Sequence, residues 1–186
     1  MTLLINACAR SNSRTLRLSK YLAEKIDKYY TELKLYDENI KPLDEKALSY
    51  RDSMIADKQF SDNIFRYAYQ FSRADKIIIA APYWDLSFPS VLKNYIEAIC
   101  VCGLTFRYLP SGEPQGLCRA EQLYYVTTAG GYIPARNYGF DYIDELCKTL
   151  FGIQKTRYIK AEGLDIFGAN VESILSKAEA EINIYT

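Results

Sequence analysis

Short apolar runs alternate with longer amphipathic stretches along the whole chain of 186 residues. Apolar or alternating runs predict five strands, at residues 2–6, 32–36, 76–81, 122–127 and 156–161. Apolar positions at helical spacing predict helices at residues 13–29, 61–73, 90–102, 138–151 and 169–185, with a short one around 44–53. Strands that alternate with helices form parallel βαβ units. The pattern therefore predicts an α/β fold with a doubly wound, five-stranded parallel sheet and helices on both faces.

Individual residues mark where several of these elements begin or end. Ser61 is expected to be the N-cap of the second main helix, and Gly103 the stop of the third. Pro82 ends the third strand, because proline has no N–H to give to a sheet. Segment 104–117 is rich in glycine and proline and predicts an excursion from the α/β alternation. No internal repeat, low-complexity tract or linker interrupts the pattern, so residues 1–186 are expected to form one domain.

The loop after the third strand is aromatic, with Pro82, Tyr83 and Trp84 followed by Asp85 and Leu86. In open α/β sheets, ligands bind beyond the carboxyl ends of the strands. Aromatic side chains at this place favour a flat, conjugated ligand. Periodicity alone leaves a second interpretation open, in which these residues pack the strand end onto the helix behind it.

The first βα loop carries polar groups suited to a phosphate: Arg10, Ser11, Ser13, Arg14 and Thr15. A helix N-terminus offers unpaired N–H groups and a partial positive charge, to which this loop adds hydroxyl and guanidinium donors. Neither G-x-G-x-x-G nor G-x-x-x-x-G-K-[ST] occurs here, so the loop predicts a mononucleotide phosphate site rather than a dinucleotide site or a P-loop. The loop alone equally allows an ordinary serine N-cap with solvated arginines.

Composition excludes several classes of function. Lysine and arginine together number 23, as do aspartate and glutamate, so no net basic charge favours nucleic acid or an acidic membrane. No apolar run approaches the roughly 20 residues of a membrane span, and the start of the chain lacks the pattern of a signal peptide. The five cysteines are odd in number and irregularly spaced, which favours reduced thiols in the cytoplasm. The absence of histidine excludes Ser-His-Asp and Cys-His triads and histidine metal ligands.

Three cysteines lie where a functional site could be suspected. Cys100 and Cys102 have a metal-like spacing, but they are predicted to lie on a helix, where residues two apart do not face each other, and no second pair follows. Both are expected to be packing residues, and no metal site is predicted. Cys8, near the phosphate loop, is interpreted as a buried small residue rather than a redox thiol.

Five segments together resemble one group of flavoproteins. Segments 81–86 (A-P-Y-W-D-L), 92–95 (L-K-N-Y) and 103–108 (G-L-T-F-R-Y) resemble the flavin-binding core of the flavodoxin-like quinone reductases. Within these they are most similar to the FMN-dependent NADH:quinone oxidoreductases, also called azoreductases. Segments 127–131 (T-T-A-G-G) and 161–163 (A-E-G) resemble the T-S-R-G-G and A-E-G segments of that group. The resemblance spans nearly the whole chain and implies a flavodoxin-like fold.

The resemblance implies that the chain binds FMN. It places the FMN phosphate on the first βα loop. It places the isoalloxazine ring beside the loop after the third strand, whose backbone N–H groups would lie near N5. The pyrimidine side of the ring would face the loop after the fourth strand. The cofactor-binding residues so implied are Arg10, Ser11, Ser13, Arg14 and Thr15; Pro82, Tyr83, Trp84, Asp85 and Leu86; and Thr127, Thr128, Ala129, Gly130 and Gly131. The two glycines would let the backbone approach the ring closely and adopt positive φ.

Four residues depart from the family pattern. Tyr83 and Trp84 stand where Met and Tyr are frequent, and both keep an apolar stacking surface. Asp85 replaces Asn, and a carboxylate near the ring would lower the flavin potential unless it points to solvent. Ala129 replaces a frequent Arg, so one polar contact is lost.

The activity implied by the resemblance is that of an FMN-dependent NAD(P)H oxidoreductase. Such enzymes pass hydride from a nicotinamide through flavin N5 to quinones, and also to azo or nitro aromatics, and one shared site implies a ping-pong sequence. Tyr132 could stack over the substrate or supply a proton, while Phe106 and Tyr108 would reach the partner's flavin in a homodimer. No residue distinguishes NADH from NADPH as the donor. An electron-carrying flavodoxin that binds redox proteins is the alternative, against which the balanced charge and segment 104–117 count. A flavin-binding relative with altered activity is a third possibility.

Overall fold

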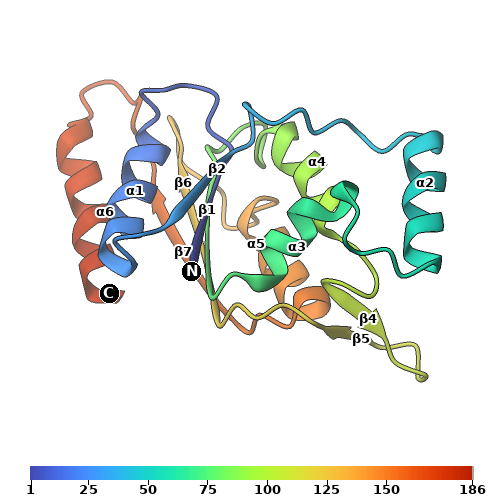
Figure 1. Ribbon diagram of the computed structural model, residues 1–186. Helices are drawn as coiled ribbons and strands as arrows, with labels where there is room; N and C mark the ends of the chain where they lie inside the picture. Colours follow the sequence, from blue (N-terminus) through green and yellow to red (C-terminus); the bar gives the residue numbers. More distant parts are fainter. Residues whose placement is uncertain (186) are drawn as a thin grey trace.

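The computed structural model describes residues 1–185 and is built on a five-stranded parallel sheet (Figure 1). The strands are β1 (Thr2–Asn6), β2 (Thr31–Lys34), β3 (Lys76–Ala80), β6 (Gln122–Thr128) and β7 (Lys155–Ala161). They lie in the order β2-β1-β3-β6-β7. Counted along the chain, this is the 2-1-3-4-5 order of the flavodoxin-like doubly wound fold. The predicted fold class is therefore confirmed.

Helices cover both faces of this sheet (Figure 1). Within residues 1–185 the α-helices are α1 (Arg14–Ile26), α2 (Glu45–Ala56), α3 (Arg66–Arg73), α4 (Ser90–Ile99), α5 (Phe140–Leu146) and α6 (Val171–Tyr185); a 3-10 turn, η1 (Asn63–Phe65), precedes α3, and a π-helical turn, η2 (Cys147–Phe151), extends α5. Helices α1 and α6 pack together on one face, and α3, α4 and α5 lie on the other. Helix α2 stands away from the sheet and buries none of its residues.

Side chains of the central strands point alternately into two apolar cores. In β1, Leu3 and Leu4 point to opposite faces of the sheet, and in β3, Ile77 and Ile78 do the same. All four side chains are fully buried. A strand buried on both faces reads as a continuous apolar run, which is why the hydrophobic pattern predicted these two strands within one residue of their observed ends.

Parallel register brings the ends of the strands together at one edge of the sheet. Asn6 pairs with Ala80, Ala80 with Val126, and Val126 with Ile159. The loops that leave this edge, called the carboxyl edge below, are residues 7–13, 35–44, 81–89, 129–139 and 162–170. Loops far apart in the sequence therefore gather where doubly wound folds bind ligands.

The second main helix begins later than predicted, and Ser61 is not its cap. Asp62 accepts a hydrogen bond from the Ile64 N–H at 2.9 Å and caps η1, while α3 starts only at Arg66. The Tyr50 hydroxyl donates to the Asp62 carboxylate at 2.8 Å and helps to hold it. An aspartate one residue after the serine thus takes the capping role, and the Ser61 prediction is wrong.

The third main helix ends at Ile99, earlier than predicted. The buried Thr105 explains this end: its hydroxyl donates to the Ile99 carbonyl at 2.7 Å and accepts from the Val101 N–H at 3.1 Å. These bonds replace the next helical turn. Gly103, with φ +90°, lies beyond the helix and opens the segment that follows, so its prediction as a helix stop is also wrong.

The predicted excursion at 104–117 is a small antiparallel hairpin of β4 (Phe106–Tyr108) and β5 (Pro114–Gly116). It projects from the end of the sheet opposite the carboxyl edge (Figure 1).

The remaining boundaries differ from the predictions by a few residues. Helix α6, for example, begins at Val171, because the Asn170 side chain caps it by accepting the Ser173 N–H at 3.0 Å. Among residues 1–185, no helix has the length and apolar character needed to cross a bilayer.

Candidate functional site

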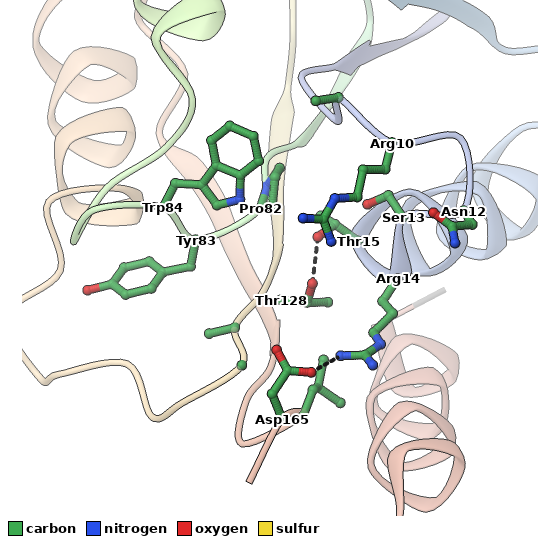
Figure 2. Close-up of a pocket in the computed structure, with 14 residues that line it drawn as sticks. Arg10, Asn12, Ser13, Arg14, Thr15, Pro82, Tyr83, Trp84, Thr128 and Asp165 are labelled. Atoms are coloured by element: carbon green, nitrogen blue, oxygen red, sulfur yellow. Dashed lines mark hydrogen bonds and ion pairs between the residues drawn. The ribbon is translucent and has the colours of Figure 1, made fainter.

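A cavity of about 410 Å³ opens at the carboxyl edge (Figure 2). Its volume falls in the range of about 300–1,000 Å³ common for small-molecule sites. It is lined by Ala9, Arg10, Asn12, Ser13, Arg14 and Thr15 after β1; by Pro82, Tyr83 and Trp84 after β3; by Thr128, Ala129 and Gly130 at the end of β6; and by Leu164 and Asp165 after β7. Three segments that the sequence predicted separately to bind a ligand therefore meet around one space.

One end of the cavity is built by the N-terminus of α1. Ser13 is the N-cap and accepts from the Leu16 N–H at 3.3 Å, and its carbonyl accepts the Arg17 N–H at 3.0 Å. The N–H groups of Arg14 and Thr15 come before those of Leu16 and Arg17 in the chain, and they have no acceptor within the helix. They present the positive end of the helix dipole to the cavity, which suits an anion.

The two arginines at this end use their charges differently. Arg14 Nη1 lies 2.7 Å from Asp165 Oδ1, so an ion pair already balances much of its charge. The Arg10 side chain extends into the cavity (Figure 2) and makes no hydrogen bond or ion pair with any residue that the structure describes, although the Arg10 carbonyl accepts from the Ser13 N–H at 3.2 Å. The Arg10 guanidinium is therefore the cation most available to an anionic ligand.

A hydrogen bond between α1 and β6 closes the floor of the cavity. The Oγ1 atoms of Thr15 and Thr128 lie 2.6 Å apart, and both side chains are buried. The Thr15 carbonyl in turn accepts from Ser19 Oγ at 2.8 Å. The start of α1 is thereby fixed against the end of β6.

Thr15→Val is expected to lower the free energy of unfolding by about 1–3 kcal/mol, because it leaves the Thr128 hydroxyl buried without a partner. At about 2–4 °C per kcal/mol for a chain of this size, Tm should fall by roughly 2–12 °C in a thermal melt. The double variant T15V/T128V removes both hydroxyls and should recover most of the loss. A single variant as stable as the parent would show that this hydrogen bond does not hold the floor.

The loop after β3 forms the next wall. The Tyr83 N–H donates to the Thr128 carbonyl at 3.0 Å, which continues the sheet ladder past the end of β3. The Tyr83 ring points away from the cavity (Figure 2), so it does not offer the stacking surface that the sequence implied. The Trp84 indole lies at the mouth with 41% of the residue exposed, and it is the flat apolar surface of this wall.

Beyond Trp84 the chain makes a two-residue turn that carries Asp85 and Leu86. Trp84 and Ser87 exchange backbone hydrogen bonds of 3.2 and 2.8 Å across it. Both turn residues have positive φ, +50° for Asp85 and +65° for Leu86, and for leucine this region costs about 1–2 kcal/mol. Both side chains are exposed and lie outside the cavity lining. The Asp85 side chain thus faces solvent rather than the cavity.

The remaining wall joins the loops after β6 and β7. The Leu164 N–H donates to the Ala129 carbonyl at 3.2 Å, and the Asp165 N–H to the Gly130 carbonyl at 2.9 Å. Neither Gly130 nor Gly131 has the positive φ expected from the sequence, so that expectation is wrong. A Cβ on Gly130 would lie 2.4 Å from Asp165 Oδ2, so the Asp165 side chain would have to shift, whereas a Cβ on Gly131 would meet open space.

Comparison with known proteins agrees with this geometry. A family model described as the flavodoxin-like fold matches residues 1–185. An FMN-dependent NADH:quinone oxidoreductase 2 of Clostridium acetobutylicum is 37% identical over an alignment of 179 positions that covers 91% of this chain and 88% of that protein. An FMN-dependent NADH:quinone oxidoreductase of Clostridium perfringens (strain ATCC 13124) is 37% identical over 86% of this chain and 83% of that protein. The chain belongs to the flavodoxin-like FMN-dependent NADH:quinone oxidoreductase family.

Solved structures share the fold of this quinone oxidoreductase family member. An azoreductase from Bacillus anthracis str. Sterne superposes with a TM-score of 0.85 over 99% of this chain and 97% of that chain, at 21% identity. An FMN-dependent NADH-azoreductase from Bacillus anthracis str. Ames Ancestor, solved in complex with FMN, superposes with a TM-score of 0.81 over 99% and 96% of the two chains, also at 21% identity. At this identity the likeness concerns the fold alone.

Four residues lining the cavity of this quinone oxidoreductase family member were not identified from the sequence: Ala9, Asn12, Leu164 and Asp165. The first two lie inside a loop that was already identified. The other two directly follow the A-E-G segment at the carboxyl end of β7, and that position was the available signal. Nothing local could indicate the ion pair of Arg14 with Asp165, which joins residues 151 positions apart.

Other residues implied by the resemblance lie outside the cavity lining. Ser11 faces a neighbouring hollow between α1 and α6. Thr127 is buried, and its hydroxyl has no hydrogen-bond partner within residues 1–185. Tyr132 is 75% exposed, and its ring lies over the turn at Gly163, where a Cβ would be 3.4 Å from Tyr132 Cε1.

Phe106 and Tyr108 lie on β4, at the end of the sheet opposite the cavity (Figure 1). Their ring centroids are 5.6 Å apart in an edge-on arrangement, with Phe106 buried and Tyr108 exposed. Within one chain neither ring can contact the cavity. A role of either ring toward a flavin therefore requires a second subunit.

The A-E-G segment has a structural role that the sequence did not reveal. Glu162 Oε2 accepts the Ile133 N–H at 2.9 Å, and Oε1 lies 2.8 Å from Lys160 Nζ. Burial by itself would raise the pKa of Glu162, but Lys160 and the Ile133 N–H together hold that pKa below its usual value. The charged carboxylate thus anchors loop 129–139 beside the cavity.

All five cysteines are free thiols. Cys8 is buried, and burial raises its pKa to about 11, which agrees with its interpretation as a packing residue. Cys100 and Cys102 lie beyond the end of α4 and not on a helix as predicted. No group of three or more His, Cys, Asp or Glu residues in the described part of the chain could hold a metal ion.

Cys8 is expected to resist alkylation in the folded protein. At pH 8 only about 0.1% of a thiol with a pKa near 11 is thiolate, and burial further hinders attack. Iodoacetamide labelling followed by peptide mass spectrometry should modify the half-buried Cys102 at least about tenfold faster. Equal labelling rates at Cys8 and Cys102 would show that loop 7–13 opens readily around Cys8.

Proposed function

We propose that this protein is an FMN-dependent NAD(P)H oxidoreductase that reduces quinones, and also azo or nitro aromatics. The observation that carries the proposal is the cavity itself, which joins a cationic end rich in N–H donors to a flat apolar wall. Its relatives are named FMN-dependent NADH:quinone oxidoreductases, which supports the same reaction and favours NADH as the donor. Residues 1–186 then act as one FMN-binding domain.

The donor set around the cavity fits FMN. At one end, the α1 N-terminus, Ser13 and Arg10 would hold the phosphate. At the other, Pro82 and Trp84 would hold the isoalloxazine, with the Gly130 backbone on the pyrimidine side. Bound there, FMN supplies the chemistry that takes hydride from a nicotinamide and gives two electrons to an acceptor.

The loop after β3 limits which of its backbone groups can serve a flavin. The N–H groups of Tyr83 and Trp84 already donate to acceptors within the protein. At the turn that follows Trp84, the N–H groups of Asp85 and Leu86 have no such acceptor and would be the donors to the N5 edge of the ring. The conformation of the two-residue turn therefore decides where these donors point.

We also propose a homodimer located in the cytoplasm. Helix α2 buries none of its residues in a single chain and leaves Leu48 and Tyr50 exposed, which supports a partner surface there. The β4–β5 hairpin would carry Phe106 and Tyr108 toward the partner's cavity. Tyr132 would cover the acceptor, and because the chain has no histidine, acceptor protons would come from water or from this tyrosine.

The proposal is tested by an anaerobic visible spectrum of protein that has been mixed with FMN and desalted, recorded before and after NADH. Retained flavin bands that bleach with NADH are the expected result, followed by reoxidation on addition of a quinone. Bands that stay unbleached with both NADH and NADPH would instead indicate an electron carrier reduced by protein partners. A desalted protein without flavin bands would contradict FMN binding.

A further inference from the structure

Three buried hydroxyl groups near the carboxyl edge have no hydrogen-bond partner within residues 1–185. They belong to Tyr83, Tyr125 and Thr127. A buried hydroxyl without a partner destabilises a protein, so native structures pair nearly all such groups, either with protein atoms or with ordered water. Three unpaired hydroxyls in one region are therefore a reason to ask what they bind.

The three side chains lie on one side of the sheet. Residues two apart on a strand point to the same side, and Tyr125 belongs to the core beneath α3, α4 and α5, so Thr127 points to that side as well. Tyr83 follows Ala81 of the same core by two residues, and its N–H extends the ladder to the Thr128 carbonyl at 3.0 Å. The Tyr83 ring accordingly points away from the cavity (Figure 2) and to the side of Tyr125.

A third phenol, Tyr158, lies beside Tyr125, with ring centroids 6.1 Å apart. Burial is the main cause of the raised pKa of Tyr125, and the nearby Tyr158 and Tyr83 phenols raise that pKa further. Burial likewise raises the pKa of Tyr158 to about 12. The Tyr158 hydroxyl accepts from Asn137 Nδ2 at 2.7 Å, which leaves its own proton to donate. Tyr125 and Tyr158 are therefore neutral hydrogen-bond donors at physiological pH.

Oxygen atoms from three segments converge beside Gly139. A Cβ on this glycine would lie 2.8 Å from the Tyr125 hydroxyl, 3.1 Å from Asn137 Oδ1 and 3.6 Å from the Ser87 carbonyl. Asn137 Oδ1 already accepts two backbone N–H groups. The Ser87 carbonyl accepts the Trp84 N–H at 3.2 Å and has a second lone pair available. The surroundings of the Tyr125 hydroxyl thus combine donors with an acceptor.

We propose that this region is a binding site for ordered water, which bridges the hydroxyls of Tyr83, Tyr125 and Thr127 to the Ser87 carbonyl and holds the loop after β3 against the sheet. A buried water molecule typically makes about three hydrogen bonds, and this region offers that number of partners. Methionine, frequent in the family at the position of Tyr83, has no hydroxyl, so the site depends on a residue in which this chain departs from the family pattern. The inference goes beyond the proposed function and does not rest on it.

Tyr125→Phe, with Tyr95→Phe as its matched control, tests the site by stability. The Tyr95 hydroxyl is also buried without a partner within residues 1–185, but its side chain packs among Phe71, Leu92 and Ile96. Y95F removes an unpaired group from apolar surroundings, so Tm should rise by about 2–6 °C. Y125F removes a hydroxyl that binds water, so Tm should fall by about 1–6 °C. A Tm of Y125F equal to or above that of the parent would overturn the inference.

The double variant Y83F/Y125F tests whether the two hydroxyls share bound water. Once either hydroxyl is removed, the water is held less well, so loss of the second should matter less. The fall in Tm of the double variant should therefore be smaller than the sum of the falls in the two single variants. Additive falls would contradict a shared site.

A high-resolution crystal structure of the full-length protein gives the direct readout. Electron density for water is expected within about 3.2 Å of the Tyr125 hydroxyl and of at least one oxygen atom of Tyr83, Thr127 or Ser87. Hydroxyls that bond directly to protein atoms, without such density, would overturn the inference. Neither the melts nor the crystal structure depends on NADH or on turnover, so failure of the proposed function would leave these results unaffected.

Discussion

Arg10→Ala is expected to weaken FMN binding by about 10–100-fold while leaving riboflavin binding unchanged. The Arg10 side chain extends into the cavity and has no hydrogen-bond or ion-pair partner within residues 1–185, so its charge is available to a phosphate. A hydrogen bond to a charged group contributes about 1.5–3 kcal/mol, which corresponds to the stated loss of affinity. Titration of each flavin, followed by the quenching of its fluorescence, measures both dissociation constants.

Arg17→Ala is the matched control for this variant. Arg17 lies on the first turn of α1 but outside the cavity lining, and its guanidinium is paired with Glu172 and Glu179 at 2.9 and 3.3 Å. Its removal should change FMN affinity less than about twofold, since a paired, exposed charge acts weakly at a distance. Equal losses for FMN and riboflavin in Arg10→Ala would show that Arg10 does not contact the phosphate.

Gly116→Ala is expected to destabilise the fold by about 3 kcal/mol and to lower Tm by roughly 6–12 °C. A Cβ on Gly116 would lie 2.2 Å from Gly152 N and 2.2 Å from the Phe151 carbonyl carbon. Both atoms belong to the backbone at the end of η2, so neither can move aside as a side chain could. Denaturation by urea and by heat measures the loss.

Gly112→Ala provides the comparison within the same hairpin. Gly112 has φ +87°, but a Cβ there would meet nothing within 4 Å. Its cost should be limited to backbone strain of about 1–2 kcal/mol. If Gly116→Ala is no more harmful than Gly112→Ala, the hairpin is not seated against η2 in solution.

The central strands of the sheet could be predicted because a strand that is buried on both faces is a continuous apolar run in the sequence. β1 was predicted with its observed ends, and the predicted third strand exceeds β3 by one residue, since both strands are covered on both faces. The start of α3 and the end of α4 could not be predicted in this way. They depend on the side chains of Asp62 and Thr105, and several nearby polar residues could have served equally well by sequence alone.

The candidate site was predictable where its residues are neighbours in the chain. The loops carrying Arg10 and Trp84 were identified from short motifs at the ends of strands, and both line the cavity. The partner of Arg14 was not identified, because Asp165 lies in the loop after β7, 151 positions away in the sequence. The direction of the Tyr83 ring was likewise decided by the sheet ladder that Tyr83 continues, which no local pattern contains.

By itself, then, the sequence determined the α/β alternation, three of the segments that line the cavity and the exclusion of histidine chemistry. Local periodicity and composition carry this information, because burial and turn formation act on neighbouring residues. Only the tertiary structure decided that Asp165 pairs with Arg14, that Gly130 lies close against the Asp165 side chain, and that the Arg10 side chain is left without an ion-pair partner within residues 1–185. These contacts form between loops that meet only when parallel strands are set in register and in the order β2-β1-β3-β6-β7.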